Sequence, residues 1–300
     1  MKVLVIGGSY FYGRVFVMLT VKQQEITVVN RGTYSMAELG AAQIKGDRRD
    51  PALWRELPGD YDAVVDFCAY EPGDIRCVLE NLTVKPGQYI FVSTVDVYRR
   101  GTGGYKAEDA PYEERILPGE AGAYIAGKVA LERELRQVCG EQGVAWTAVR
   151  PGILYGPYNY APRESLLIQM MVRQQILPRI TDADGKFQLV YVKDAAEAIR
   201  QCLCNPLTYG KAYNICMGEP VTYGRLADTL LRVCDGTVQE MPMSAEQAQR
   251  QGIPLPFAVR EQETELYDNG KSLWELGLVY TSLEEGMGKT YRAFKNVYQD

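Results

Sequence analysis

The 300-residue sequence contains no histidine. Histidine is the side chain whose ordinary pKa lies closest to neutral pH, so its absence removes the commonest proton carrier of enzymes. Ser-His-Asp hydrolysis, histidine-ligated zinc and a histidine general base are therefore excluded. Any proton transfer must fall to a tyrosine, a lysine, a cysteine or a carboxylate.

Other features that would define a class are also missing. The seven cysteines are odd in number, scattered in spacing and form no CxxC pair, which argues against a disulfide framework and against a metal site. Several lie in apolar runs, where a free cysteine is usually a small buried hydrophobe. No apolar run approaches the roughly 18 residues of a membrane span, and the opening MKVLVIGG is too short for a signal peptide. We expect a cytoplasmic protein without a membrane partner.

Positive charge is not in excess either. The chain has 33 Lys and Arg against 38 Asp and Glu, a net charge of −5, whereas a nucleic-acid-binding face needs clustered Lys and Arg. The 46% apolar and 24% charged fractions are those of an ordinary globular protein. We therefore expect a small-molecule substrate and no nucleic-acid partner.

What is present is a regular succession of apolar runs. Runs rich in β-branched residues predict strands at 3–6, 26–29, 43–45, 63–68, 89–93 and 146–149. Helical patterns separate them, notably over 14–19, 72–82 and 124–139. Strands without apolar–polar alternation that alternate with helices predict a parallel sheet covered on both faces. The expected fold class is α/β, a doubly wound parallel sheet of the Rossmann type.

A glycine-rich loop follows the first strand and opens the first helix: Gly7, Gly8, Ser9, Tyr10, Phe11, Tyr12 and Gly13. A dinucleotide-binding fingerprint requires that position, because glycines allow the tight turn and the helix N-terminus offers free N–H groups to a pyrophosphate. Tyr10 stands where the fingerprint has its middle glycine. Either its side chain points away, or cofactor binding is altered.

Beyond Tyr155 the rhythm breaks. Prolines interrupt shorter elements, helices are expected over 164–175 and 194–204, and residues 237–265 carry only a weak pattern. We interpret residues 1–155 as a dinucleotide-binding domain whose sheet residues 186–216 rejoin. Residues 156–185 and 217–300 then form a smaller C-terminal lobe that binds the substrate.

The residues after the second strand distinguish NAD(H) from NADP(H). An acidic residue there would accept from the ribose 2′-OH and repel a 2′-phosphate, but the sequence reads Val29-Asn30-Arg31-Gly32. The planar guanidinium of Arg31 suits a phosphate, so NADP(H) is favoured over NAD(H), with Asn30 beside it. The alternative interpretation is that Arg31 is an ordinary solvated surface arginine.

Tyr124 and Lys128 lie one helical turn apart, on one face of the helix expected over 124–139. A nearby cation stabilises a phenolate and lowers the pKa of tyrosine from about 10. The same spacing recurs at positions 267/271 and 291/295, so spacing alone is not specific. The first pair, however, follows a strand ending in Ser93-Thr94, at the sheet edge where ligands bind in such folds.

These motifs occur in a characteristic order: VIGGSYFYG, VVNRG, GDRRD, YIFVSTVDVY, YIAGK, RPGILYGP and LVYVKDAAEAI. In that order the chain resembles the extended short-chain dehydrogenase/reductase superfamily, in its NAD(P)-dependent epimerase/dehydratase branch. The resemblance spans nearly the whole chain, since YNICMGEPVTYGRL and DNGKSLWELGLVYTSLEEGM resemble the later parts of that branch.

The resemblance implies a set of roles. Tyr124 would be the catalytic acid/base, Lys128 would hold the nicotinamide ribose and lower the Tyr124 pKa, and Thr94 would hydrogen-bond the reacting oxygen. Family members often pair through the helix that bears the Tyr and Lys, which implies a homodimer. Further cofactor contacts would come from Asp47, Arg48, Cys68, Ala69, Tyr70, Pro151 and Gly152.

The chain departs from the sugar-nucleotide members at one position. Where they carry an Arg that grips a diphosphate, this chain has Gln188, and the missing charge would fall to Lys186 or Arg163. A second acid/base is not evident. Its candidates are Asp96, Tyr155 and Cys68, and the candidate substrate-binding residues are Asp96, Tyr155 and Arg163.

We predict an NAD(P)-dependent oxidoreductase, epimerase or dehydratase that acts on a hydroxyl or carbonyl substrate, sugar-like in character, by hydride transfer with a tyrosine acid/base. The alternative is a non-catalytic cofactor-sensing regulator or RNA-binding member of the same fold. Tyr10 supports that alternative, as do VVNRG and GDRRD, which resemble a divergent group that includes chloroplast stem-loop RNA-binding proteins. We favour the enzyme because Thr94, Tyr124 and Lys128 are all present and the net charge is negative.

Overall fold

The computed structural model describes residues 1–57 and 59–298. Its centre is a seven-stranded sheet in the order β11-β7-β5-β4-β1-β2-β3, and every pairing within it is parallel. The order runs outward from β1 in both directions, which confirms the predicted doubly wound sheet. The strands are β1 (Lys2–Ile6), β2 (Glu25–Asn30), β3 (Ala42–Lys45), β4 (Ala63–Asp66), β5 (Gln88–Val92), β7 (Ala145–Pro151) and β11 (Lys211–Ile215).

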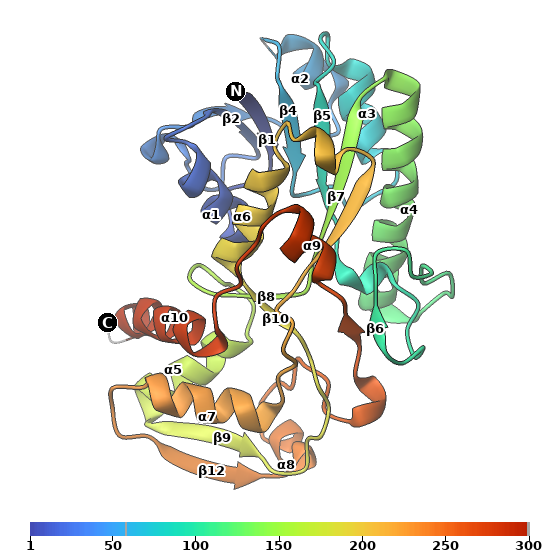
Figure 1. Cartoon of the computed structure of the whole chain (residues 1–300). Helices are drawn as coiled ribbons and strands as arrows, with labels where there is room; N and C mark the ends of the chain where they lie inside the picture. The colour runs from blue at the N-terminus through green and yellow to red at the C-terminus, as the bar shows by residue number, and fades with distance from the viewer. Residues whose placement is uncertain (58, 299–300) are drawn as a thin grey trace.

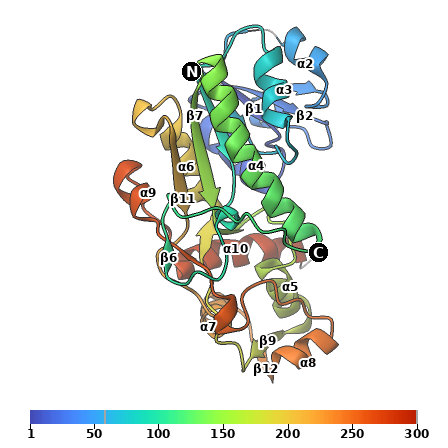
Figure 2. The same cartoon turned by 90° about the vertical axis from the view of Figure 1, so that its right-hand side faces the viewer.

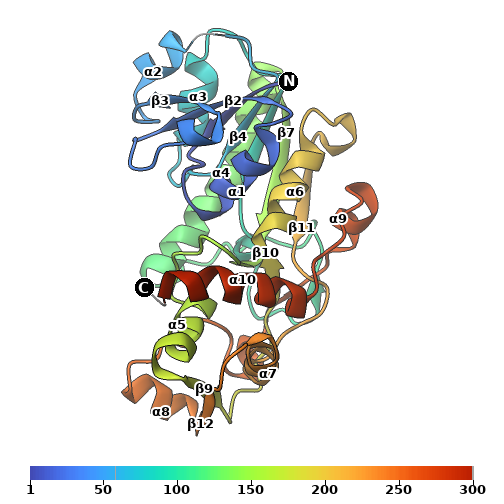
Figure 3. The same cartoon turned by 90° about the vertical axis from the view of Figure 1, so that its left-hand side faces the viewer.

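Both faces of this sheet are buried, which explains why its strands lack apolar–polar alternation. Along β1, Val3 and Val5 belong to one buried core, whereas Leu4 and Ile6 belong to another on the opposite face. Figures 1 and 3 show the helices of the first core on one side of the sheet. The first core lies under α1 (Phe11–Thr20) and α6 (Val192–Cys202), and the second under α2 (Pro51–Glu56), α3 (Asp74–Asn81) and α4 (Gly119–Gln142).

A second lobe with its own apolar core lies below the sheet in Figure 1. Tyr155, Phe187 and Met287 are among its buried side chains. Two short parallel pairs belong to this region, β8 with β10 and β9 with β12. Its elements are β8 (Ile153–Tyr155), α5 (Glu164–Gln174), β9 (Ile176–Ile180), β10 (Leu189–Tyr191), α7 (Tyr223–Val233), β12 (Gln239–Met243), α8 (Ala245–Arg250) and α10 (Leu283–Tyr298).

Part of the C-terminal region packs on the sheet rather than in the second lobe. Leu276 and Leu278, which follow α9 (Gly270–Glu275), are buried in the first core with α1 and α6. A further short pair, β6 (Tyr105–Lys106) with β13 (Leu266–Tyr267), joins the loop after β5 to this region. Short 3-10 turns complete the chain: η1 (Ala37–Leu39), η2 (Val95–Val97), η3 (Pro206–Thr208) and η4 (Glu261–Glu263).

The carboxyl ends of the parallel strands meet at the edge that faces the second lobe. Figure 2 shows α4 running along the sheet, with the end that carries Tyr124 nearer that lobe. The topology therefore brings the ends of β1, β2, β4, β5 and β7 to one place, as expected for a ligand site in an open α/β sheet. Within residues 1–57 and 59–298, no helix is both long and apolar enough to cross a membrane.

Candidate active site

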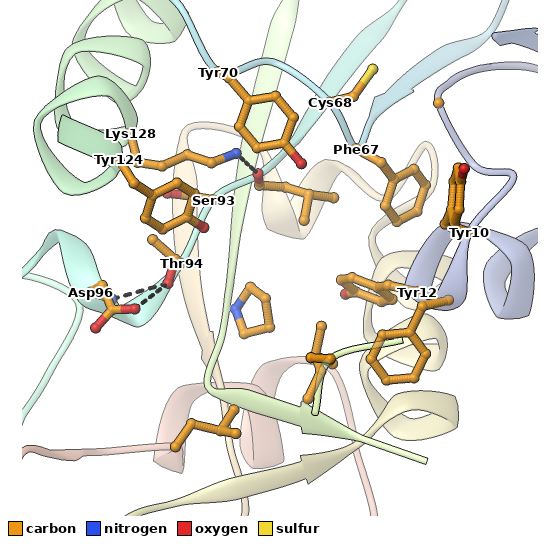
Figure 4. A pocket seen from close by; sticks show the side chains of 18 of the residues that line it. Tyr10, Tyr12, Phe67, Cys68, Tyr70, Ser93, Thr94, Asp96, Tyr124 and Lys128 are labelled. Atoms are coloured by element: carbon orange, nitrogen blue, oxygen red, sulfur yellow. Dashed lines mark hydrogen bonds between the residues drawn. The ribbon is translucent and has the colours of Figure 1, made fainter. Parts of the chain in front are cut away.

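A cavity of about 1250 Å³ lies between the carboxyl edge of the sheet and the second lobe. It is lined by all seven residues of the glycine loop and by the Thr94, Tyr124 and Lys128 side chains. Figure 4 shows Tyr124, Lys128 and Thr94 on one side of this space and Tyr10 and Tyr12 on the other. The cavity thus brings together motifs that the sequence separates by more than a hundred residues.

The glycine loop has the backbone that only glycine adopts easily. Gly7 and Gly8 have φ values of 90° and 72°, in the left-handed region. Gly13 allows a close approach, since a Cβ on it would lie 2.3 Å from the Cα of Gly8. The loop therefore forms a tight cradle against the start of α1, with the helix N–H groups directed at the cavity edge.

Tyr10 points out of this cradle. Its backbone is extended, and its side chain is 48% exposed. The ring packs edge-on against Tyr34 at 4.6 Å and against Tyr160 at 6.0 Å between ring centroids. The ring therefore packs against other tyrosines at the rim of the cavity, which it still lines, rather than against the glycine turn. Tyr12, in contrast, is buried and donates to the carbonyl of Ala195.

The residues at and after the end of β2, Asn30 and Arg31, differ in whether their side chains are available to a ligand. Asn30 is buried and occupied: its amide donates to Ser9 Oγ at 3.2 Å, and its Oδ1 accepts from Gly32 N and from Gln43 Nε2. Arg31 is exposed, lines the cavity, and makes no ion pair among the described residues. Asn30 therefore shapes the loop, while the Arg31 guanidinium remains available to an anion.

Arg48 lines the cavity, but its charge is already committed. Its two terminal nitrogens donate to the two carboxylate oxygens of Asp66 at 2.7 and 2.8 Å. Burial would raise the pKa of Asp66, but the Arg48 charge outweighs burial and holds it below the ordinary value. Arg48 and the exposed Asp47 both line the cavity, and their approach to an adenine stays a prediction.

Cys68, Ala69 and Tyr70, in the segment after β4, contribute to the site in different ways. Cys68 and Tyr70 line the cavity, whereas the Ala69 side chain is fully buried away from it. Ala69 acts instead through its carbonyl, which accepts from Lys128 Nζ at 2.9 Å. Burial raises the pKa of the Cys68 thiol to about 11. Cys68 is therefore a neutral thiol at physiological pH, which argues against it as the second acid/base.

Lys128 is 3% exposed and is held by backbone carbonyls. Its Nζ donates to Ala69 O at 2.9 Å and to Val92 O at 3.0 Å, which leaves one of its three protons for a ligand. It also lies 4.8 Å from the centre of the Tyr70 ring. Burial lowers the pKa of Lys128 to about 8, so the lysine is charged at neutral pH and loses its charge in mild base.

The Tyr124 phenol borders the cavity beside Thr94. Burial is the largest cause that raises the pKa of Tyr124 above its ordinary value, the Asp96 carboxylate adds to the rise, and the Thr94 hydroxyl opposes it. The expected lowering by Lys128 is wrong for the protein alone, because the Lys128 ammonium is directed at Ala69 and Val92 and lies 5.9 Å from the Tyr124 ring centre.

Asp96 and Arg100 extend the site beyond Tyr124. Asp96 Oδ2 accepts from Thr94 Oγ1 at 3.3 Å, and its Oδ1 accepts from Arg100 Nη2 at 2.6 Å. Thr94 also accepts from Asp96 N, so the 3-10 turn η2 begins at the catalytic candidate itself. The carboxylate is therefore fixed within reach of the Thr94 hydroxyl and open to the cavity.

Some of the predicted substrate-binding residues from the second lobe line the cavity and others do not. Arg163 and Lys186 line the cavity, as do Pro151 and Gly152 at the end of β7. Tyr155 does not: it is 1% exposed in the second core, and its hydroxyl has no partner among the described residues. The expectation that Tyr155 binds substrate or serves as an acid/base is wrong, because its ring lies in the apolar core beneath α10.

Gln188 lines the cavity, but its side-chain amide is already hydrogen-bonded within the protein. It is 2% exposed; its amide donates to the carbonyls of Met217 and Tyr267, and its Oε1 accepts from Tyr267 N at 2.6 Å. These hydrogen bonds tie Gln188 to Met217 and to Tyr267 of β13. Nothing in the single sequence distinguished such an internal glutamine from a ligand-binding one.

Sequence analysis also missed a buried ion pair behind the site. Glu132 of α4 accepts from Arg150 of β7 at 2.8 and 2.6 Å, and both side chains are at most 1% exposed. Ser93 and Tyr112 also donate to Glu132, each at 2.6 Å. Glu132 lies one turn after Lys128 on the inner face of α4, a position that its spacing would have indicated.

The residues at the cavity fit a dinucleotide. The turn at Gly7, Gly8 and Gly13 is packed too tightly to admit a Cβ at Gly8 or Gly13, and the cavity that it lines extends past Arg31 to Lys128.

The chain matches the model of the family described as NAD dependent epimerase/dehydratase family over residues 76–216. This match agrees with the resemblance to the epimerase/dehydratase branch of the extended short-chain dehydrogenase/reductase superfamily that the motif order carries.

Two relatives and one solved structure illustrate the range of this family. The chain is 28% identical over 231 residues to the chloroplast stem-loop binding protein of 41 kDa b of Arabidopsis thaliana, a match that covers 71% of this chain and only 58% of that protein. It is 26% identical over 268 residues to dTDP-glucose 4,6-dehydratase of Streptomyces niveus, covering 78% of each chain. UDP-glucose 4-epimerase of Thermotoga maritima, solved with UDP-glucose, shares 21% identity and a TM-score of 0.76 over 99% of both chains. That last likeness establishes the shared fold.

Proposed function

We propose that this chain is an NAD(P)-dependent enzyme of the epimerase/dehydratase branch that exchanges a hydride with a hydroxyl or carbonyl carbon of a sugar-like small molecule. The observation that carries the proposal is the convergence of Thr94, Tyr124 and Lys128 on the cavity that begins at the glycine loop. The 26% identity to a dTDP-glucose 4,6-dehydratase supports the sugar-like substrate.

The chain's own residues divide the work. The glycine loop would hold the pyrophosphate, Asp47 the adenine, and Lys128 the nicotinamide ribose. Cys68, Tyr70, Pro151 and Gly152 would line the rest of the cofactor channel. When bound, the dinucleotide supplies hydride exchange and, in its oxidised form, a positively charged ring.

Tyr124 is a phenol at neutral pH, because its pKa is raised. The phenol would donate its proton to a carbonyl oxygen as the carbon is reduced, and the resulting phenolate would take a proton back from the hydroxyl when the carbon is oxidised. Thr94 would hydrogen-bond the same oxygen. Asp96 and Arg163 would bind the rest of the substrate, and Asp96 is the remaining candidate for a second acid/base.

The Tyr124→Phe variant tests this mechanism, with Tyr209→Phe, a tyrosine outside the cavity, as the matched control. UDP-glucose and dTDP-glucose serve as the first substrates, and product formation is followed by mass spectrometry. General acid/base catalysis contributes on the order of 10²–10⁴ in rate, so we expect Tyr124→Phe to lose at least about 100-fold and Tyr209→Phe to match the wild type. Wild-type turnover in Tyr124→Phe would refute the assigned role.

We further propose that NADP(H) is preferred, with Arg31 as the residue that binds the 2′-phosphate. Arg31 is exposed at the cavity edge without an ion pair among the described residues, and no acid follows β2. A charge-assisted hydrogen bond contributes about 1.5–3 kcal/mol, so Arg31→Ala should weaken NADPH binding by roughly 10-fold or more. NADH binding should not change. Equal affinities of the wild type for NADPH and NADH would contradict the preference.

A homodimer through the exposed side of α4 stays a proposal, which sedimentation of the purified chain would test. The non-catalytic RNA-binding alternative is not favoured, because the Thr/Tyr/Lys set is intact and the net charge is −5.

A further inference from the structure

The rim of the cavity carries an aromatic contact that joins its two walls. Tyr10 lies at the start of α1, and Tyr160 lies in the 156–163 loop that enters the second lobe. Their rings meet edge-on at 6.0 Å, and Tyr160 also meets Phe11 at 6.5 Å. Tyr34 supports Tyr10 from the other side at 4.6 Å. Edge-to-face pairs at these separations are attractive.

Hydrogen bonds hold the backbone of the 156–163 loop on both sides of Tyr160, since Ala161 N donates to Asn159 Oδ1 and Ala161 O accepts from Ser165 Oγ. Buried Glu164 accepts from Gly156 N at 3.2 Å and from Asn159 Nδ2 at 2.8 Å, and Arg14 of α1 lies 5.5 Å above the Tyr158 ring. Tyr160 itself is 76% exposed. The fold therefore fixes where this ring stands without burying it, so core packing does not explain the residue.

The same ring faces the far wall of the cavity. Tyr160 lines the cavity together with Tyr70 and Tyr124. Burial is the main cause that raises the pKa of Tyr70 and of Tyr124, and the Tyr160 phenol contributes to both shifts. Tyr160 thus contacts the glycine loop through Tyr10 and Phe11 and lines the same cavity as the catalytic candidates.

We propose that Tyr10 and Tyr160 form an aromatic clamp that closes over the bound dinucleotide and slows its release. The inference rests on the proposed function and deepens it. Tyr10 occupies the loop position at which a glycine would leave the opening wider, and it meets its partner from the opposite lobe there. A cofactor that leaves slowly suits a redox-neutral reaction, in which the same molecule accepts and returns the hydride, over a reaction that exchanges cofactor at each turnover.

The test is the dissociation rate of NADPH, measured by stopped-flow fluorescence after mixing the complex with excess NADP⁺, and repeated with NADH and NAD⁺. Tyr160→Ser and Tyr10→Gly should each release NADPH about 2- to 10-fold faster, the range that an aromatic pair contributes. The double variant should be no faster than the faster single variant, because each substitution already removes the same contact. Tyr160→Phe keeps the ring and should restore the wild-type rate.

Tyr209→Ser, at a half-exposed tyrosine outside the cavity, is the matched control and should release NADPH at the wild-type rate. Tyr160→Ser removes an exposed ring, so its folding is secure even if that of Tyr10→Gly is not. Wild-type release rates in both single variants, or additive effects in the double variant, would overturn the clamp and leave the proposed function standing. Failure of the wild-type chain to bind NADPH or NADH would overturn the proposed function itself.

Discussion

Removing the guanidinium of Arg150 should destabilise the protein strongly. Arg150 donates to both carboxylate oxygens of Glu132, at 2.8 and 2.6 Å, in a region where both side chains are essentially unexposed. Arg150 also donates to the Tyr98 hydroxyl at 2.5 Å. In Arg150→Met, the buried Glu132 would keep Ser93 and Tyr112 as hydrogen-bond donors and the half-exposed Arg136 guanidinium at 3.9 Å, but would lose its buried partner. Breaking one side of such a pair typically costs about 3–5 kcal/mol.

The same contacts determine how this loss of stability depends on pH. Burial would raise the pKa of Glu132, but the hydrogen bonds and charge of Arg150 hold it below its ordinary value. A carboxyl with a lowered folded-state pKa stabilises the fold above its unfolded-state pKa, and this stabilisation is lost as the pH falls through the folded-state pKa. The difference in stability between the wild type and Arg150→Met should therefore be largest near neutral pH and shrink in acid.

Urea unfolding followed by circular dichroism and by tryptophan fluorescence measures this difference, and coincidence of the two probes checks the two-state assumption. The double variant Glu132→Leu/Arg150→Met is the control. It removes both charges, so it should lose less than Arg150→Met does. A loss below about 1 kcal/mol in Arg150→Met would show that the buried carboxylate does not need its partner and would refute the reasoning.

Three further outcomes follow from single contacts. NADPH affinity should fall as the pH rises through about 8, where Lys128 loses its charge, and the affinity of Lys128→Met should not change over this pH range. Because the folded-state pKa of Lys128 lies below the ordinary 10.5, the free energy of unfolding should rise with pH between about 8 and 10.5. Gly13→Ala places a Cβ against Gly8 and should cost about 1–3 kcal/mol in urea unfolding and weaken NADPH binding in the fluorescence titration. Tyr155→Phe removes a buried hydroxyl without a partner among the described residues and should raise the free energy of unfolding by about 1 kcal/mol, with turnover unchanged.

The strands of the sheet were predictable because the reason for their pattern is local. Val3 to Ile6 face two cores in turn, so every position must be apolar and the run is visible in the sequence. The second lobe was less predictable. Its strands are short and its core draws on segments from Tyr155 to Phe294, so no one stretch carries a complete pattern.

The same distinction applies to the site. The glycine loop and the Tyr124–Lys128 pair were predictable because each lies within one turn of chain, and the cavity does bring them together. The ion pair of Arg48 was not predictable because its partner, Asp66, comes from a different strand. The burial of Tyr155 was not predictable because it depends on α10, more than a hundred residues away. A polar residue type indicates the chemistry that it can perform, but its distant neighbours decide whether that chemistry is available.

The absence of histidine gives particular weight to the protonation states of Tyr124 and Lys128. In the protein alone, the pKa of Lys128 falls to about 8 while that of Tyr124 rises above its ordinary value. The lysine would therefore lose its proton before the tyrosine does, so a charged lysine beside a phenolate is not the resting arrangement. Tyr124 rests as an acid, ready to protonate a carbonyl oxygen. For it to act as a base, positive charge must come closer to the phenol than Lys128 Nζ does, since the carbonyls of Ala69 and Val92 hold that ammonium in place.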